Sequence, residues 1–310
     1  MNYIDFTNPF LGRRWLLSLT ADKQFGLSFK PLLAHDKDYM GFTFQSNQFG
    51  LRGPDNVKSD SVICGTSYGM GLSVDNGQNW YELSRTCSQF FNVSMPVGTQ
   101  NHINRVNNLY QGDASDLYFI YHPNIWSISA AFDKALNENK SITDIMAWKT
   151  TIPDAILLSF RRFFKNTYKR ATSRLIFHKY GRFEYRMDAN YSYFDLVQKE
   201  EFANRELNRI LDLFRMFKRV KVFRVPIKEQ VYYQLTNDPR CEKLIRNYES
   251  NWNFLLDGLS EYEHVSTVDL CNKGIFSLTD YLPRDTHWSV SGNEKFSEQF
   301  DVNVAGRTVT

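Results

Sequence analysis

The chain has 310 residues, of which 42% are hydrophobic and 15% aromatic. This composition excludes a disordered chain and is typical of a globular enzyme or binding protein with a sizeable core. The formal net charge of +3 is too small to indicate nucleic-acid binding by itself, so no nucleic-acid partner is expected.

The first 56 residues precede the first predicted strand, and we expect them to form an extension that packs on the core. The opening MNYIDFTNPFLGRRWLLSLT has no long apolar run behind a basic head, which argues against a signal peptide. No window approaches the roughly 18 uninterrupted apolar residues of a membrane span. The four cysteines are far apart and have no histidine at metal-ligand spacing: Cys64, Cys87, Cys241 and Cys271. They predict reduced, mostly buried thiols in a cytoplasmic protein without a metal site.

Short apolar runs that are typical of buried parallel strands recur along the chain. They comprise 61–64, 89–95, 116–122, 221–227 and a weaker run at 265–271. Segments with helical character lie between them, at 79–87, 99–111 and 199–220. Strands that alternate with helices predict an α/β fold, with a parallel sheet of about five strands covered on both faces.

A long insertion, at about 140–198, separates the third predicted strand from the strongest predicted helix. Its stretch 161–186 carries nine Lys and Arg residues against one acid, Glu184, and aromatic residues interleave with the cations. Such a surface suits an anionic glycan, the phosphates of an acyl-CoA donor, or anionic lipid headgroups. We expect a peripheral membrane contact through 152–186, with a solvated helical hairpin as the alternative.

Ser67 follows the first predicted strand by two residues, in the segment SVICGTSYGMG. In open α/β sheets ligands bind at the carboxyl ends of the strands, which is where this position should lie. Gly65 and the small Thr66 allow a sharp turn that would present the Ser67 hydroxyl and N–H to a substrate. A serine in such a place is, on its own, more often a turn or helix-cap residue.

Asp285 and His287 lie two positions apart near the end of the chain, in DTHW. A serine hydroxyl needs an imidazole as base and a carboxylate to orient that imidazole before it can attack an ester at neutral pH. This loop could supply both groups, although an isolated D-x-H is more often a surface loop or a helix cap. Together with Ser67, it predicts a catalytic triad.

Two further strand ends carry groups that could hold an oxyanion. Gly98 lies in the turn after the second strand, and Asn124 follows the third. Backbone N–H groups and an asparagine amide are donors used to stabilise a tetrahedral intermediate. We therefore expect the Ser67 N–H, a backbone N–H near Gly98 and the Asn124 side chain to form the oxyanion hole.

Four sequence blocks contain Ser67, Gly98, Asn124 and the pair Asp285 and His287. Their order and strand context resemble the SGNH (GDSL-like) hydrolase superfamily over roughly residues 57–301. Residues 302–310 form a C-terminal tail. The resemblance implies a flavodoxin-like three-layer α/β/α sandwich, with Ser67 as nucleophile, His287 as base and Asp285 as its orienter. Three positions depart from the family pattern. Thr66 stands where the family has Asp, Ile125 follows Asn124 in place of Asp, and the displaced second block leaves Val97 and Gly98 both open as the oxyanion donor.

The segment NQFGLRGPD (47–55) and the element DTHWSVSG look similar to SGNH proteins that act on bacterial polysaccharides, including the alginate O-acetyltransferase group. This narrower resemblance implies an O-acetyltransferase or O-acetylesterase that acts on a carbohydrate through an acyl-serine. It needs no cofactor, and acetyl-CoA is one candidate acyl donor. We expect Arg52, Trp126 and Trp288 to bind substrate, the tryptophans by stacking on a sugar ring, with core packing as their alternative role. The competing hypothesis is a noncatalytic glycan- or membrane-surface-binding protein that keeps the fold.

Overall fold

The computed structural model describes residues 19–22, 24–35, 42–113, 115–137, 200–271, 274–282 and 287–305. At its centre is a five-stranded parallel sheet in the order β6-β5-β7-β8-β9. The strands are β5 (Ser61–Gly65), β6 (Phe91–Asn92), β7 (Asp116–Tyr121), β8 (Arg219–Arg224) and β9 (Val265–Asp269). In chain order this is a 2-1-3-4-5 arrangement, which is the flavodoxin-like topology. The predicted sheet is confirmed, and all five strands overlap the predicted runs.

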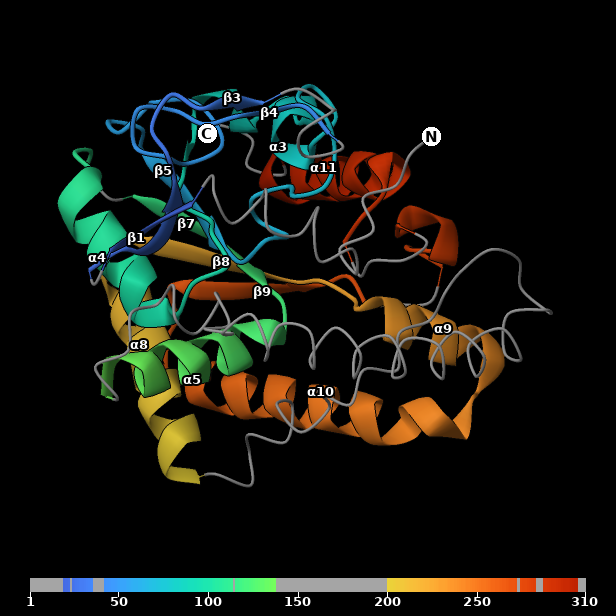
Figure 1. Cartoon of the computed structure of the whole chain (residues 1–310). Coiled ribbons are helices and arrows are strands. Elements are labelled where there is room, and N and C mark those ends of the chain that lie inside the picture. The colour runs from blue at the N-terminus through green and yellow to red at the C-terminus, as the bar shows by residue number, and fades with distance from the viewer. Residues whose placement is uncertain are drawn as a thin grey trace, which may run out of the picture.

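Helices cover both faces of the sheet, which gives three layers (Figure 1). They are α3 (Trp80–Leu83), α4 (Thr99–Leu109), α5 (Asn124–Asn137), α8 (Glu200–Arg215), α9 (Lys228–Thr236), α10 (Pro239–Leu259) and α11 (Val290–Ala305). α4, α5, α8 and α10 lie on one side, and α3 and α11 on the other. The predicted α/β/α sandwich is therefore confirmed.

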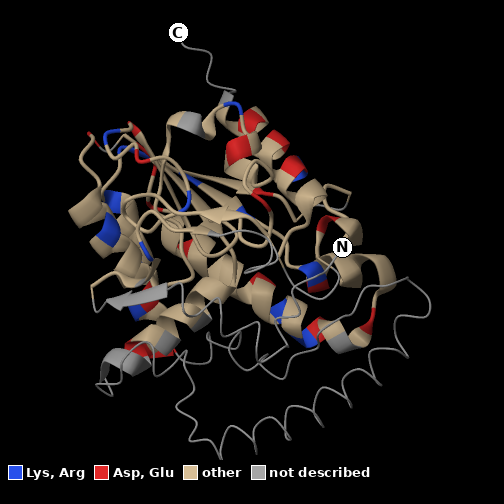
Figure 2. Cartoon of the chain, turned by 45° about the horizontal axis from the view of Figure 1, so that its top comes forward, with Lys and Arg blue, Asp and Glu red and all other residues tan. Residues whose placement is uncertain are grey.

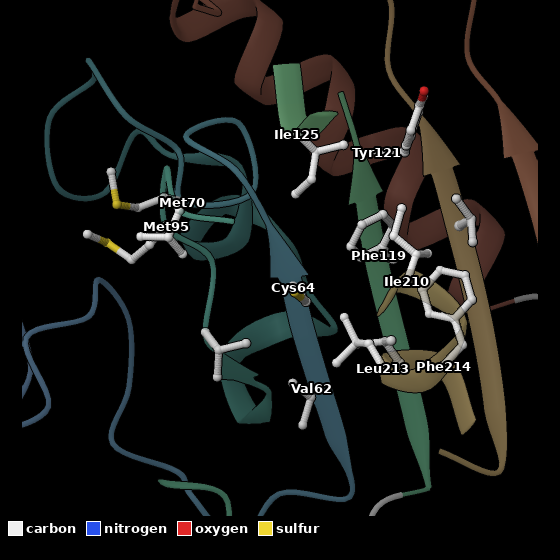
Figure 3. Close-up of a cluster of buried hydrophobic side chains, with 14 of the residues drawn as sticks. Val62, Cys64, Met70, Met95, Phe119, Tyr121, Ile125, Ile210, Leu213 and Phe214 are labelled. Carbon is white, nitrogen blue, oxygen red and sulfur yellow. The ribbon is translucent and has the colours of Figure 1, made fainter. Parts of the chain in front are cut away.

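Successive residues of the inner strands β5 and β7 divide between two apolar cores, because neighbouring side chains of a strand point to opposite faces. On β5, Val62 and Cys64 face the core under α8, whereas Ile63 joins the core under α3 and α11. On β7, Phe119 packs edge-on against Phe214 of α8, with ring centroids 5.3 Å apart. Figure 3 shows the first of these cores between β5, β7 and α8. β5 and β7 are continuous apolar runs because both of their faces are buried, whereas the edge strand β9 is partly exposed.

The predicted extension contains four short strands: β1 (Leu19–Asp22), β2 (Gly26–Phe29), β3 (Ala34–His35) and β4 (Phe44–Gln45). None of these strands was predicted from the sequence. These strands form two small antiparallel sheets, β1-β2 and β3-β4, apart from the main sheet. Phe29 and Phe44 pack together with centroids 4.2 Å apart and belong to the same apolar core as the main sheet.

All four cysteines are free and buried, as the sequence predicts. Among the described residues, no helix is long and apolar enough to cross a membrane. The described residues also contain no cluster of three or more His, Cys, Asp or Glu side chains that could hold a metal ion. On α10, as on other described helices, basic and acidic residues occur close together (Figure 2), and Arg246 pairs with Glu242 at 3.6 Å.

Two buried histidines make the stability of the fold depend on pH. Burial lowers the pKa of His102, on α4, to about 3, and that of His122, just after β7, to about 3. Both side chains are neutral in the folded state, whereas a histidine of the unfolded chain has a pKa of roughly 6.5. Between about pH 6.5 and pH 3 the unfolded state binds more protons, so the free energy of unfolding falls as the pH is lowered.

We therefore expect each of these histidines to remove about 1.4 kcal/mol of stability between pH 8 and pH 5.5. Urea unfolding at the two pH values measures the difference. A His102→Gln variant keeps a polar side chain that does not titrate. Its loss of unfolding free energy between the two pH values should be smaller by about 1.4 kcal/mol. An undiminished loss in that variant would show that His102 is not buried in its neutral form.

Candidate active site

Ser67 lies at the carboxyl edge of the sheet, two residues beyond β5. Because β6 and β7 flank β5 on opposite sides, this edge is where the chain connections diverge and where ligands bind in open α/β sheets. The residues after Ser67 fold back as a tight turn, in which the Leu72 N–H donates to the Ser67 carbonyl at 3.1 Å. The Trp80 indole donates to the Tyr68 carbonyl at 3.0 Å and holds the turn against α3.

Gly69 allows this turn to sit close to the end of β6. A Cβ atom there would lie 2.5 Å from the Ser94 Oγ, closer than real Cβ atoms approach, and in a tight contact of 3.1 Å with the Gly65 Cα. The absence of a side chain at Gly69 is what permits the approach, as expected for a glycine in a crowded turn. The small-residue segment GTSYG therefore packs the nucleophile turn tightly onto its neighbours.

His287 reaches the Ser67 turn from the other end of the chain. Its Nε2 lies 2.7 Å from the Ser67 Oγ, although the two residues are 220 positions apart. This distance is that of a hydrogen bond in which the hydroxyl can donate to an unprotonated ring nitrogen. The structure thus brings together the serine and the histidine that the sequence singled out.

Hydrogen bonds at both ends of its loop fix the position of His287. The Leu282 N–H donates to the His287 carbonyl at 2.9 Å, and Tyr281 pairs with Trp288 in an isolated antiparallel bridge. Lys228, at the start of α9, donates from Nζ to the Leu282 carbonyl at 2.7 Å. These contacts join the two ends of the loop to each other and to the start of α9, which follows β8.

The buried carboxylate of Asp280 anchors this base to α11. It accepts hydrogen bonds from the Ser277 N–H at 2.7 Å, the Ser291 hydroxyl at 2.8 Å and the Lys295 Nζ at 2.6 Å. Burial alone would raise the pKa of Asp280, but the hydrogen bond from Lys295 and those from the two serines lower it below its usual value. The charged Asp280 carboxylate therefore has a structural role at the foot of the loop that carries His287.

Asp285, the predicted orienter of His287, lies outside the described residues. Its role therefore stays a prediction from the sequence. The basic stretch 161–186 and the predicted membrane contact through 152–186 also lie outside them.

The candidate oxyanion donors occupy strand ends and helix starts at the same edge. Within the described residues, neither the Ser67 nor the Gly98 backbone N–H donates a hydrogen bond to the protein. Both residues are buried, and buried N–H groups are almost always paired. Two such groups left available are consistent with donors that receive a ligand oxygen. Gly98 is the N-cap residue of α4, and Asn124 is the first residue of α5.

The Gly98 turn is fixed against α5 by a buried network. The Thr99 N–H donates to the Ser129 Oγ at 3.0 Å, and that hydroxyl in turn donates to the Glu206 carboxylate at 2.5 Å. A Cβ on Gly98 would lie 3.2 Å from the Ser129 Cα, so the glycine packs closely on this helix. Burial raises the pKa of Glu206, while its hydrogen bonds to Ser129 and Thr99 oppose that rise.

Two residues beside the pair were not predicted from the sequence as part of the site. His122 stacks on Tyr68 with ring centroids 4.1 Å apart and an interplanar angle of 16°. The Tyr68 ring also lies 5.4 Å from the His287 ring. The available signal was a histidine at the end of the buried run DLYFIYH, directly before the candidate block containing Asn124.

Burial contradicts the predicted substrate contacts of the two tryptophans. Trp126 and Trp288 are each only 2% exposed. The Trp126 indole donates to the Tyr121 hydroxyl at 2.9 Å. Trp288 is stacked on Phe296 with centroids 4.7 Å apart. Neither ring offers a face to a sugar, so the alternative role in the core is the one observed.

Arg52 is likewise a structural residue, and its predicted contact with substrate is wrong. It is 1% exposed, and its guanidinium donates to the Gly71 and Val74 carbonyls, the latter at 2.8 Å. These bonds tie the N-terminal extension to the segment that follows the Ser67 turn. The guanidinium is therefore engaged within the protein by these backbone carbonyls.

We compared the chain with protein families, curated proteins and solved structures. No protein-family model matches the chain, and no curated protein matches it. A solved structure with 13% sequence identity covers 80% of this chain and 84% of its own, with a TM-score of 0.36. It is a Streptococcus pneumoniae protein provisionally described as a platelet activating factor.

Proposed function

We propose that the protein is a serine-dependent acyl-ester enzyme of the SGNH type, an O-acetylesterase or O-acetyltransferase that acts on a carbohydrate. One observation carries the proposal: the Ser67 Oγ lies 2.7 Å from the His287 Nε2. The pair stands at the carboxyl edge of a flavodoxin-like sheet, where such chemistry is commonly located. The sequence resemblance supplies the carbohydrate as substrate class.

The reaction would begin with attack of the Ser67 Oγ on the acyl carbonyl carbon, while the His287 Nε2 accepts the hydroxyl proton. The carbonyl oxygen would become an oxyanion, held by the Ser67 and Gly98 N–H groups and the Asn124 amide. As the carbon–oxygen bond to the leaving alkoxide breaks, His287 would return the proton to that oxygen. The product of this half-reaction is an acyl-serine.

The second half-reaction would use the same groups in reverse. His287 would accept a proton from water or from a sugar hydroxyl, whose oxygen attacks the acyl-serine carbonyl. Breakdown of the second oxyanion would release the Ser67 Oγ, which recovers its proton from His287. The attacking oxygen alone distinguishes hydrolysis from transfer, and no cofactor is needed. An acyl donor such as acetyl-CoA would enter as the first substrate; in that case the carbon–sulfur bond breaks and the coenzyme A thiol takes the place of the alkoxide as leaving group.

The surroundings of Ser67 favour a short acyl group. The residue is only 5% exposed, and Tyr68, His122 and His287 crowd its turn. A long acyl chain would have to displace these rings, whereas an acetyl group adds few atoms beyond the carbonyl. An acetyl group is therefore the acyl group that this packing favours, whether it is hydrolysed or transferred.

A fluorophosphonate probe read by intact mass tests the proposal. We expect one adduct on the wild type and none on Ser67→Ala, because phosphonylation requires an activated serine oxygen. Ser94→Ala removes another buried serine from the same edge of the sheet and should label like the wild type. Labelled protein would then justify assays with acetyl donors and oligosaccharide acceptors.

Absence of an adduct on folded wild type would overturn the enzyme proposal. The protein would then fit the competing hypothesis, a glycan- or membrane-surface-binding protein without turnover. Labelling of Ser67→Ala at the wild-type rate would assign the reactive oxygen elsewhere.

A further inference from the structure

We propose that His122 is a positioning residue that ties Asn124, a candidate oxyanion donor, to the turn that carries the nucleophile. This inference rests on the proposed function and adds a residue to the same site. The ring of His122 does not contact the substrate in this proposal. It acts through its two neighbours, Asn124 and Tyr68.

The sheet register places His122 opposite the nucleophile. In the parallel pairing of β5 with β7, Gly65 lies beside Ile120. Two positions further along each chain are Ser67 and His122. Since the carboxyl ends of parallel strands meet at one edge, the two residues leave the sheet side by side.

One ring nitrogen of His122 fixes the start of α5. Its Nδ1 accepts the backbone N–H of Asn124 at 3.3 Å, within the turn that leads from β7 into the helix. The first N–H groups of a helix have no partner inside the helix, so a side-chain acceptor stabilises the start. The position of Asn124, and with it the reach of its side-chain amide, depends on this contact.

The flat face of the ring fixes the other side of the site. His122 lies face to face with Tyr68, the residue next to the nucleophile, with centroids 4.1 Å apart. The Tyr68 ring in turn meets the Trp288 ring edge-on at 5.0 Å. One imidazole therefore contacts both the nucleophile turn and the block that carries Asn124.

The contact with Asn124 also defines the protonation of His122. An Nδ1 that accepts a hydrogen bond carries no proton, so in the neutral ring the proton is on Nε2. Nε2 is buried and has no hydrogen-bond partner among the described residues. Burial, together with a smaller effect of a charge on nearby His287, lowers the pKa of His122 to about 3. A neutral His122 therefore adds no repulsion when His287 takes the serine proton.

A mere filler of the core would not need the ring nitrogen. Phenylalanine would pack on Tyr68 as well as histidine does, and asparagine would offer an acceptor near the Nδ1 position without the stack. The two substitutions therefore separate the contacts. They form the basis of the test.

We expect His122→Phe to lower the kcat of acetyl-ester hydrolysis by about 10- to 100-fold with little change in KM, as for other small misplacements of a catalytic group. His122→Asn should recover much of that loss. In an Asn124→Ala background, His122→Phe should have little further effect on kcat, because it acts through Asn124. Circular dichroism would verify that each variant is folded.

A second measurement does not depend on turnover. Hydrogen exchange of the Asn124 amide should be faster in His122→Phe than in the wild type and close to the wild-type rate in His122→Asn. Suppose that the wild type labels with fluorophosphonate and that His122→Phe has the same kcat as the wild type. This result would overturn the role of His122 and leave the proposed function standing. A folded wild type that neither labels nor turns over would overturn the proposed function, and the positioning role with it.

Discussion

Replacing Ser67 or His287 by alanine should abolish turnover of an acetyl ester while the melting temperature stays nearly unchanged. Each change removes one partner of the 2.7 Å contact between Oγ and Nε2 and leaves the proposed oxyanion donors in place. Loss of a triad nucleophile or base typically lowers kcat by more than about 10³-fold. Hydrolysis of 4-nitrophenyl acetate, together with differential scanning fluorimetry, measures both quantities.

The two alanine variants should be about equally impaired, because the serine and the histidine act as one unit. Asp285→Asn is expected to be milder than His287→Ala, since it alters the orientation of the base and leaves the base in place. Ser94→Ala is the matched control and should retain wild-type kcat. Equal rates for Ser67→Ala, His287→Ala and the wild type would contradict the assignment of the catalytic pair.

Asn124→Ala should lower kcat by about 10²- to 10³-fold with a small effect on KM. The reason is that an oxyanion donor meets a full negative charge only in the transition state, and removing one such donor raises the barrier by roughly 2.7–4 kcal/mol. Steady-state kinetics on the same ester gives kcat and KM separately.

Asn108→Ala, an exposed asparagine on α4, controls for a general effect of removing an amide. It should leave both constants unchanged. If Asn124→Ala kept the wild-type kcat, the Asn124 amide would have no part in stabilising the intermediate. Donation by the two backbone N–H groups would then have to suffice.

The inner strands could be predicted because they are short apolar runs buried on both faces, whereas the partly exposed edge strand β9 gave a weaker run. That pattern persists in any environment that covers both sides, as Val62 and Ile63 show by facing two different cores. The meeting of Ser67 and His287 could be anticipated for a related reason. Parallel strands all end at one edge, so polar residues that follow them tend to converge there.

The four short strands of the extension escaped prediction because two to four residues are too few for a period to show. The buried Arg52 could not be predicted either, since its carbonyl acceptors follow the Ser67 turn and only the tertiary fold brings them near. The sequence predicted a contact with substrate. The hydrogen bonds of Arg52 explain its burial.

The two tryptophans show why sequence proximity to a catalytic residue is a poor guide to orientation. Trp288 follows His287 directly, yet its ring is buried and stacks on Phe296. Trp126 comes two positions after Asn124 on a helix, which rotates it by roughly 200° about the axis. Both side chains therefore turn inward when their neighbours turn toward the site.

The span of 220 positions between the paired serine and histidine affects when the site can assemble. Translation proceeds from the N-terminus to the C-terminus, so the Ser67 turn is synthesised before the loop that carries His287. Closing so large a loop carries an entropic cost, which the docking of α11 onto α3 helps to offset. We therefore expect the contact between Ser67 and His287 to form only after α11 has been synthesised and has packed.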